Sequence, residues 1–394
     1  MTKRPTRLAK KKTFLLLIAL LLQIAIARAV ILFSTADPAA NTSAPTGSLA
    51  GSGWQYEGSF GAFLGTPIAS QFFLSAKHIG GASSVFIFQG TTYTIVNHFF
   101  DPASDLAIWQ VAELFPYFSP LYTKSDEMGQ HLVAIGRGTQ RGSPVINGTL
   151  RGWYWGASDG VERWGDNIVS GTAVLGPQNE TLYASFNETG LPNECHLSVG
   201  DSGGALFLSD GGIWKLAGIH YSVDGYFYID SNGGGQFDAA LFDARDYYLS
   251  DGGNPPTYTQ ITGPAPVPSG FYSTRVSSKL GWIYSVLDPN GDGDRDGIHN
   301  LCEYAFFLNP VVPDASGAPK AMRAGGNLAL IYTKVLSATD ITYIVERSTD
   351  LVSWLPAQTT DQLLGENNGV QTVQSSVAMR RNSRLFLRLK ITRL

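Results

Sequence analysis

Three residues in this sequence have the types and settings that acyl-transfer chemistry needs. Ser202 lies among glycines in the stretch SVGDSGGALF, His78 ends the apolar run QFFLSAKH, and Asp105 opens the apolar run DLAIWQV. A serine hydroxyl becomes an effective nucleophile when a neutral imidazole takes its proton and a carboxylate orients that imidazole. The sequence therefore predicts a catalytic triad of these three residues, provided that strands and a tight loop bring them together.

Two alternatives stay open at this point. The stretch around Ser202 could be a plain glycine turn before a strand, since glycines and an aspartate are common in turns. His98 and Asp101 are a competing base and acid in the same hydrophobic stretch as Asp105, although neither stands at the end of a clear strand.

Together, the three motifs resemble those of the trypsin/chymotrypsin-like serine proteases. They read Ser-Ala-Lys-His at 75–78, Asp-Leu-Ala-Ile at 105–108 and Gly-Asp-Ser-Gly-Gly at 200–204, in the family's order. The resemblance covers about residues 50–250 and implies two six-stranded antiparallel barrels. It also implies that Ser202 is the nucleophile, His78 the base and then the acid, and Asp105 the orienting carboxylate. The backbone N–H groups of Gly200 and Ser202 would form the oxyanion hole.

The residues near the specificity pocket depart from the trypsin branch of that family. His196 stands six positions before the nucleophile, where trypsin-like members have an aspartate. The run Gly-Ile-His at 218–220 resembles the pocket strand of bacterial glutamyl endopeptidases. That resemblance implies that His220, helped by His196, reads an acidic substrate side chain. The alternative is that His220 packs between strands as a structural residue.

The first 29 residues read as a secretory signal peptide. A basic start precedes the run TFLLLIALLLQIAIA and the small-residue site Ala27-Arg28-Ala29, which fits the three-part pattern of such peptides. An uncleaved anchor helix is the alternative. Cleavage would expose Val30, and the family resemblance implies that its new ammonium pairs with Asp201; an N-terminal tail without such a role is equally compatible. The expected location is secreted, extracellular or periplasmic, including the cell surface.

Composition narrows the function classes. Residues 1–29 hold seven of the 28 Lys/Arg and none of the 32 Asp/Glu, so the chain without them has a net charge of −11. An acidic protein is a poor partner for nucleic acid. No other stretch is long and apolar enough for a stable membrane span after signal cleavage. The two cysteines, Cys195 and Cys302, lie far apart and are expected to be free.

An acidic run follows the first β-rich part. Asp292-Gly-Asp294-Arg-Asp296-Gly is followed by five residues and then Glu303, which matches the spacing of an EF-hand calcium loop. In this register Ile298 offers a backbone carbonyl and Asn300 holds the ninth position. His299 replaces the usual apolar residue, and no clear helix precedes the loop. The loop therefore resembles the single calcium loops of bacterial secreted proteins, dockerin-like or thrombospondin-type-3-like, and predicts structural calcium; a solvated acidic linker is the alternative.

The chain divides into five parts in this interpretation: a signal peptide (1–29), a protease domain (30–250), a Pro/Gly-rich linker (251–272), a calcium-loop segment (273–310) and a C-terminal β-module (311–394). Short apolar strands separated by turns predict an all-β fold. One exception is FDAALFDARDYYL, from residue 237, whose spacing favours a helix. The C-terminal module could bind glycans or a cell surface, anchor the protein or act as a secretion signal.

The function predicted from the sequence is that of a secreted serine endopeptidase that cuts protein or peptide substrates through an acyl-enzyme. It would use structural calcium and no organic cofactor, and the pocket strand implies a preference for acidic residues before the cut. The alternative is a catalytically inactive binding or adhesion protein that keeps the protease fold.

Overall fold

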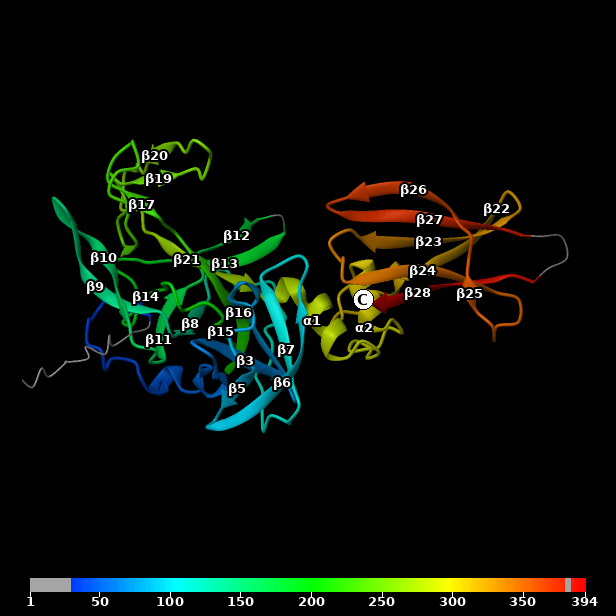
Figure 1. Ribbon diagram of the computed structural model, residues 1–394, viewed down its shortest axis with the longest axis horizontal. Coiled ribbons are helices and arrows are strands. Elements are labelled where there is room, and N and C mark those ends of the chain that lie inside the picture. The colour runs from blue at the N-terminus through cyan, green and yellow to red at the C-terminus, as the bar shows by residue number, and fades with distance from the viewer. Residues whose placement is uncertain (1–29, 177, 380–383) are drawn as a thin grey trace, which may run out of the picture.

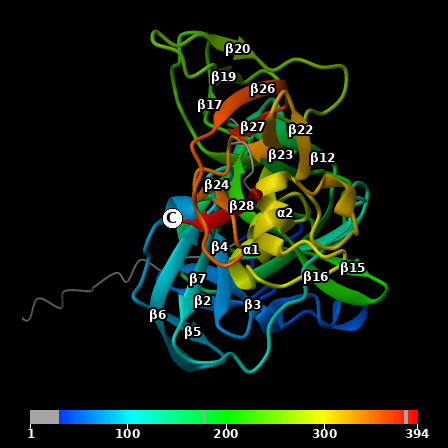
Figure 2. The same ribbon diagram turned by 90° about the vertical axis from the view of Figure 1, so that its right-hand side faces the viewer.

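The computed structural model describes residues 30–176, 178–379 and 384–394, and it is mostly β. The predicted signal peptide lies outside the described residues. Figure 1 shows a larger β-rich body at the left, a smaller β-module at the right, and the helices α1 (Leu280–Leu287) and α2 (Asn300–Phe306) between them. Figure 2 shows both helices in front of the larger body when the molecule is seen from the module's side.

The N-terminal half of the larger body is a closed six-stranded antiparallel barrel. Its strands follow the order β2-β3-β4-β7-β6-β5 around the ring. Aromatic side chains fill the interior, among them Phe60, Phe73 and Phe86, which are fully buried; the Phe73 and Phe86 rings stack at 4.0 Å. The strands are β2 (Gly58–Phe60), β3 (Phe63–Ala69), β4 (Phe72–Ala76), β5 (Val85–Phe88), β6 (Thr91–Phe100) and β7 (Leu106–Val111).

The second half of the larger body centres on a seven-stranded antiparallel sheet with the order β11-β8-β15-β16-β21-β13-β12. Its core joins that of the barrel, because Leu64 and Ile108 of the barrel and Ile135 and Ile219 of the sheet belong to one buried cluster. The strands are β8 (His131–Gly136), β11 (Arg163–Ile168), β12 (Gly171–Leu175), β13 (Asn179–Ser185), β15 (Ala205–Asp210), β16 (Ile213–Val223) and β21 (Gly270–Arg275).

The predicted second six-stranded barrel is therefore not closed by the pairings of the described strands. A separate three-stranded sheet, β18-β10-β9, stands beside the seven-stranded sheet. Three register shifts interrupt the pairing of β9 (Thr139–Asn147) with β10 (Thr149–Ser158). One edge of β10 pairs with β9 and the other edge pairs with β18 (Ala239–Leu241). The β9–β10 hairpin therefore does not connect the edge strands β11 and β12 of the larger sheet into a ring.

The helix predicted from residue 237 is wrong. Residues 239–241 form β18, and residues 248–250 form β19 (Tyr248–Ser250). Ala239, Ala240, Leu241 and Phe242 are all buried, so this run has two apolar faces instead of one helical stripe. A short continuous apolar run of this kind suits a buried strand as well as a helix, and here pairing with β10 decides for the strand.

The segment predicted as a linker takes part in the fold. β17 (Phe227–Tyr228), β19 and β20 (Tyr258–Gln260) form a small sheet, which rises above the larger body in Figure 1. β21 then returns to the seven-stranded sheet between β13 and β16. The two ends of this excursion meet, because Asp224 N–H donates to the Gly270 carbonyl at 2.9 Å and Gly270 N–H donates to Asp224 Oδ2 at 2.8 Å.

Helix α1 belongs to the larger body by its packing. Trp282, Ile283 and Val286 are buried in the cluster that holds the barrel and sheet cores. Helix α2 packs instead on the module, where Ala305 and Phe306 share a cluster with Val335 and Ile341. The predicted calcium-loop segment (273–310) thus begins in the larger body and ends against the C-terminal module.

The C-terminal module consists of two antiparallel sheets, β22-β23-β27-β26 and β25-β24-β28. The apolar alternation expected from the sequence gives β23 (Asn327–Val335), β24 (Ile341–Ser348) and β28 (Phe386–Arg393). The remaining strands are β22 (Lys320–Ala324), β25 (Leu355–Pro356), β26 (Thr360–Asn367) and β27 (Val370–Ala378), and the two-stranded pair β1 (Ile31–Leu32) and β14 (Cys195–His196) belongs to the larger body.

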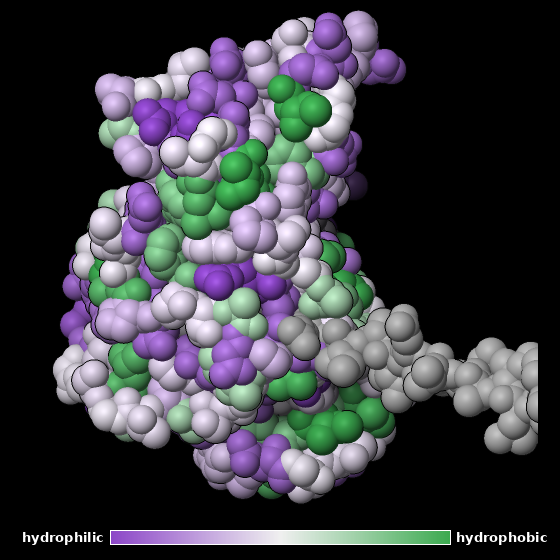
Figure 3. Space-filling model, turned by 90° about the vertical axis from the view of Figure 1, so that its left-hand side faces the viewer, coloured by the Kyte–Doolittle hydropathy of each residue, from purple (hydrophilic) through white to green (hydrophobic). Residues whose placement is uncertain are grey.

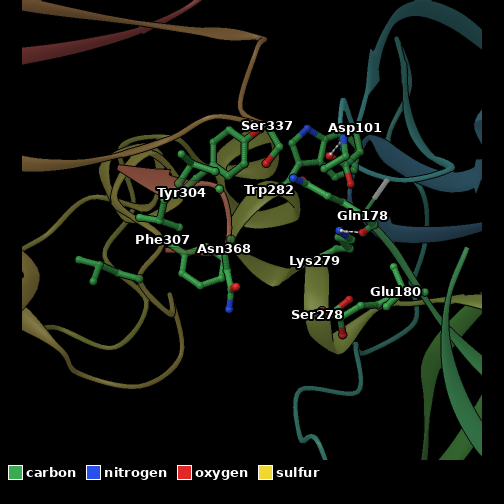
Figure 4. Close-up of a pocket in the computed structure, with 17 residues that line it drawn as sticks. Asp101, Gln178, Glu180, Ser278, Lys279, Trp282, Tyr304, Phe307, Ser337 and Asn368 are labelled. Atoms are coloured by element: carbon green, nitrogen blue, oxygen red, sulfur yellow. Dashed lines mark hydrogen bonds between the residues drawn. The ribbon is translucent and has the colours of Figure 1, made fainter. Parts of the chain in front are cut away.

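A cavity of about 660 Å³ lies between the two bodies (Figure 4). Asp101 and Gln178 line it from the larger body, Trp282 and Tyr304 from the two helices, and Asn368 from the module. Lys279 Nζ donates to the Gln178 carbonyl at 3.1 Å across this space. Helix α1 packs in the core of the larger body, α2 packs in that of the module, and the two helices contact each other, so they join the module to the larger body.

The surface at the end where β9 and β10 lie is mixed. Figure 3 shows its apolar side chains in small groups separated by polar ones; Ile146 and Leu150, beside the β9–β10 turn, are exposed. Within the described residues, no helix has the length and apolar character needed to cross a bilayer. Both cysteines are free, as predicted; Cys195 is buried and Cys302 half-buried.

Candidate active site

The three predicted triad residues lie in one hydrogen-bonded chain. His78 Nδ1 is 2.6 Å from Asp105 Oδ2, and His78 Nε2 is 2.8 Å from Ser202 Oγ. In the tautomer that satisfies both contacts, Nδ1–H donates to the carboxylate and Nε2 accepts the serine hydroxyl. This is the arrangement in which the imidazole can take the proton of Ser202.

Strand pairing explains why His78 and Asp105 meet. Ala76 at the end of β4 pairs with Leu106 at the start of β7, so the residues just beyond both strands fall at the same end of the barrel. The single-turn 3₁₀ helix η3 (Lys77–Ile79) follows β4. Lys77 N–H donates to the Asp105 carbonyl at 2.6 Å, and His78 N–H donates to Asp105 Oδ1 at 3.0 Å. Asp105 therefore fixes both the backbone and the ring of His78.

The glycines around Ser202 are required by close approach. Gly203 has φ +81°, and a Cβ there would lie 2.8 Å from the Leu64 carbonyl oxygen of β3 and collide with Ser75 Oγ. Gly200 has φ +96°, a conformation that glycine adopts at little cost. The N–H groups of Gly200 and Ser202 donate none of the hydrogen bonds found in the described part of the chain. Two unused N–H groups beside a nucleophile are what an oxyanion hole needs.

The structure separates the competing base and acid from Ser202. His98 is exposed on β6, with its ring against Phe100 and Trp109. Asp101 is buried in a turn, where its carboxylate accepts bonds from Ala103 N–H and Ser104 Oγ. Both residues therefore have structural surroundings and no contact with the nucleophile.

A cavity of about 270 Å³ opens beside Ser202. Six of its eleven lining residues are aliphatic or aromatic, and sequence reasoning missed two of the aromatic ones: Trp155 from β10 and Tyr226 from the excursion after β16. Neither lies in a motif; the β9–β10 hairpin brings Trp155 to the cavity, and the excursion after β16 brings Tyr226. The cavity is lined by Trp155, Leu197, Ser198, Val199, Asp201, Ser202, His220, Tyr221, Ser222, Val223 and Tyr226.

His220 lines this cavity with both ring nitrogens already engaged. Nε2 is 3.1 Å from the Ile135 carbonyl and Nδ1 is 2.9 Å from Ser273 Oγ. Because a carbonyl can only accept, Nε2 carries the proton and Nδ1 accepts the Ser273 hydroxyl. Burial lowers the pKa of His220 to about 3, against the opposing effect of the Ile135 carbonyl. The ring is therefore neutral at pH 7 and has no N–H left to donate to a substrate carboxylate.

His196 is not among the residues that line the cavity. It is fully buried in β14, with its ring edge-on to Phe186 and Phe271. Nδ1 is 2.5 Å from the Leu197 carbonyl and Nε2 is 3.2 Å from Ser269 Oγ. Burial lowers the pKa of His196 to about 4. The structure thus gives this residue a core position and does not bring it to the predicted specificity site.

Asp201 and Val30 are in contact beneath the nucleophile loop. Both are buried, and the Asp201 carboxylate accepts bonds from Gly138 N–H at 2.6 Å and Ser198 N–H at 2.8 Å. The Val30 backbone N–H is a further donor to it. Burial raises the pKa of Asp201 to about 6, although these donors act in the opposite direction. The described residues place no Lys, Arg or His side chain in an ion pair with this carboxylate.

The acidic loop has the donors that a hard cation requires. Carboxylate oxygens of Asp292, Asp294 and Asp296 lie within 4.8 Å of one another. Glu303 is fully buried on α2, and neither of its carboxylate oxygens has a hydrogen-bond partner. Burial raises the pKa of Glu303 to about 7, with the neighbouring aspartates adding to the effect. An orphaned buried carboxylate beside three others fits a calcium ion well.

The two other predicted calcium ligands also lie in this loop. Asn300 Nδ2 donates to the Asp288 carbonyl at 2.8 Å, and the buried Asn300 Oδ1 has no hydrogen-bond partner. The side chain of Ile298, whose backbone carbonyl is the predicted ligand, is buried. Asp314, eleven residues beyond Glu303 and outside the loop pattern, contacts the loop through its backbone N–H, which donates to Asp296 Oδ2 at 2.9 Å.

Comparisons with known proteins add little at the level of sequence. No family model matches the chain, and no curated protein matches it. Among solved structures, it is similar to neuropsin, described as a serine protease expressed in the limbic system of mouse brain. That match has 14% sequence identity and a TM-score of 0.39, and it covers 60% of this chain and 96% of the neuropsin chain. Any assignment of function therefore depends on the residues of this chain itself.

Proposed function

We infer that this protein is a serine endopeptidase of the chymotrypsin-like kind. The observation that carries the proposal is the hydrogen-bonded chain from Asp105 through His78 to Ser202, next to two unused backbone N–H groups. Each part has a separate chemical task in acyl transfer. A fold without this activity would have no need to hold all of them in register.

The proposed reaction proceeds in two halves. Ser202 Oγ attacks the substrate carbonyl carbon while His78 Nε2 takes the hydroxyl proton, and the oxyanion is held by Gly200 and Ser202 N–H. The protonated His78 then gives its proton to the leaving amine, and an ester to Ser202 remains. Water attacks that ester with His78 again as base, which releases the acid and restores the serine. Asp105 keeps the imidazole oriented and stabilises its positive charge throughout.

The side chain accepted before the cut is proposed to be uncharged and apolar. Leu197, Val199, Val223 and Trp155 line the cavity beside Ser202, and no Lys or Arg is among its lining residues, so burying a substrate carboxylate there without a cation would be costly. The preference for acidic residues implied by the Gly-Ile-His strand would require His220 to release one of its two partners. An uncharged preference is therefore the better supported of the two.

Cleavage-site profiling on a peptide library decides between these preferences. We expect Leu, Met, Phe or similar residues before the cut, and a profile that His220→Gln alters little. Enrichment of Glu or Asp in the wild type, lost in His220→Gln, would contradict the apolar assignment and restore His220 as the specificity residue. Lys77→Gln is a matched control. It also replaces a titratable side chain with an amide, but Lys77 is not among the residues that line the cavity.

Secretion and calcium remain part of the proposal. Signal cleavage after Ala29 would release a chain that acts outside the cytoplasm, and the loop at 292–303 is proposed to hold structural calcium through Asp292, Asp294, Asp296, the Ile298 carbonyl, Asn300 and Glu303. Calcium supplies positive charge and coordination there and has no step in catalysis. Contact of the C-terminal module with glycans or a cell surface is a further proposal that rests on its separate position alone.

A fluorophosphonate probe tests the central proposal. Such probes phosphonylate a serine only when a base and an oxyanion hole activate it. We expect stoichiometric labelling of the folded protein at Ser202, and no labelling of Ser202→Ala. Absence of labelling in the folded wild type, or equal labelling of the variant, would instead favour the inactive binding or adhesion protein.

A further inference from the structure

Five buried side-chain oxygens without hydrogen-bond partners gather at the joint between the two bodies. They are Asp294 Oδ2, Asn300 Oδ1, both carboxylate oxygens of Glu303, and Asp314 Oδ1. All five are acceptors, and burying an acceptor without a donor is unfavourable, the more so when it is charged. In the described chain, no lysine or arginine forms an ion pair with any of these carboxylates. A cation is needed to compensate the negative charge of these buried carboxylates.

Asp314 is the member that the loop pattern does not contain. Its backbone N–H donates to Asp296 Oδ2 at 2.9 Å, which places the residue against the loop. Its Oδ2 accepts a bond from Asn309 N–H at 3.2 Å, and this fixes the carboxylate with Oδ1 left over. Asp314 therefore lies next to the predicted ligands of the loop.

The chain after α2 is folded back onto the loop by backbone packing as well. A Cβ at Gly293 would lie 2.9 Å from the Pro310 carbonyl oxygen, so the glycine between two aspartates lets the segment before Asp314 approach. This contact is independent of any charge. It shows that the approach of Asp314 is built into the path of the chain.

We propose that Asp314 is a ligand of the cation, so that the metal site is shared between the loop at 292–303 and the segment that follows α2. The donors are then the Ile298 carbonyl and the side chains of Asp292, Asp294, Asp296, Asn300, Glu303 and Asp314. An all-oxygen set of this size with bulky carboxylates suits Ca²⁺, which takes six to eight oxygens in flexible geometry, better than Mg²⁺, which requires a tighter octahedron.

The shared site has a mechanical consequence. A cation bound to both Asp292 and Asp314 would join the two ends of a chain segment that contains α2. The same helix is tied to the module, because Tyr343 Oη donates to the Ala305 carbonyl at 2.7 Å and Thr333 Oγ1 donates to the Phe306 carbonyl at 2.8 Å. The cation would therefore hold the loop, α2 and the start of the module as one unit, instead of merely ordering a loop.

Calcium titration of the full secreted chain tests this assignment. The measurements use the Ser202→Ala background to prevent self-digestion, with isothermal titration calorimetry for affinity and trypsin sensitivity near Lys320 as a second readout. We expect Asp314→Asn to weaken Ca²⁺ binding at least tenfold, since affinity in such sites depends on the number of charged ligands, and to expose the segment to trypsin at calcium concentrations that protect the parent. Asp361→Asn, an exposed carboxylate on β26, is the matched control and should bind as the parent does.

Two outcomes would overturn the proposal. If Asp314→Asn binds Ca²⁺ as tightly as the parent while Glu303→Gln does not, the site belongs to the loop alone. If the parent binds no Ca²⁺, there is no calcium site at this joint. Neither readout depends on peptide hydrolysis, so failure here leaves the proposed protease activity untouched, and failure of fluorophosphonate labelling would leave the metal assignment untouched.

Discussion

Replacing Asp105 with Asn should lower kcat/KM about 10⁴-fold, equivalent to about 5.5 kcal/mol of transition-state stabilisation. Asp105 Oδ2 accepts the proton of His78 Nδ1, and Oδ1 accepts the His78 backbone N–H. An asparagine can keep the shape of this contact, but its amide N–H₂ facing the ring would favour the tautomer with the proton on Nε2. That tautomer cannot accept the proton of Ser202. Steady-state kinetics on a peptide substrate, with circular dichroism to verify folding, measures the loss.

The matched control for this substitution is Asp101→Asn. Asp101 was the competing acid in the sequence, and it lies four residues away in a turn that it stabilises through Ser104 and Ala103. We expect it to cost stability while the folded fraction keeps its kcat/KM within a few-fold. If the Asp101 variant instead lost activity 10⁴-fold and the Asp105 variant did not, the triad assignment would be wrong.

The second large effect concerns the N-terminus. A chain that begins at Val30 should be at least 10²-fold more active than one that carries two extra residues before it. Asp201 is a buried carboxylate with N–H donors from Gly138, Ser198 and Val30 but no cationic side chain in an ion pair. A free ammonium at Val30 would supply that charge, and breaking a buried pair by removing one partner costs roughly 3–5 kcal/mol. Asp201 lies between Gly200 and Ser202 in the nucleophile loop, so the loss should be visible in kcat.

N-terminal sequencing of the secreted protein and kinetics of the two chains check this prediction. Asp201→Asn in the chain that begins at Val30 should produce a similar loss, because it removes the other partner. Activity should also decline at alkaline pH as the Val30 amine, with an ordinary pKa near 7.7–8.0 raised by its partner, loses its proton. A mature N-terminus well downstream of Val30, or full activity of the extended chain, would rule out the pairing.

Much of the strand framework could be predicted from the sequence. Apolar runs such as FFLSA and HLVAIG became β4 and β8, and NLALIYTKV became β23 with the same bounds. These runs are either continuously apolar or alternate between apolar and polar residues, so the sequence pattern alone indicates a buried or half-buried strand. The segment from residue 237 was mispredicted because its apolar spacing fits a helix and a strand equally well, and the partner that decides between them, β10, lies more than eighty residues earlier.

The triad could be predicted for a different reason. His78 follows the end of a strand, Asp105 precedes the start of one, and Ser202 lies in a tight loop that requires glycine, so the local sequence around each residue indicates its position. The specificity residues could not be predicted in this way. The bonds of His220 to Ile135 and Ser273, the core position of His196, and the arrival of Trp155 at the cavity all depend on pairings between distant strands. Asp314 likewise escapes any local pattern, because the chain must fold back over α2 to reach the loop.

The excursion between Asp224 and Gly270 changes how the protein can be divided. Val223 pairs directly with Phe271 in the β16–β21 ladder, and the Asp224 carboxylate accepts bonds from Tyr183 Oη and Tyr272 Oη as well as from Gly270 N–H. In topological terms, these 45 or so intervening residues are a long insertion in the connection between two paired strands. Their proline-rich stretch therefore lies inside one folding unit and does not separate two domains. A proteolytic nick there would leave β21 and α1 held in place by the strands on both sides, whereas a chain that stopped at the same point would lack an interior strand of the sheet.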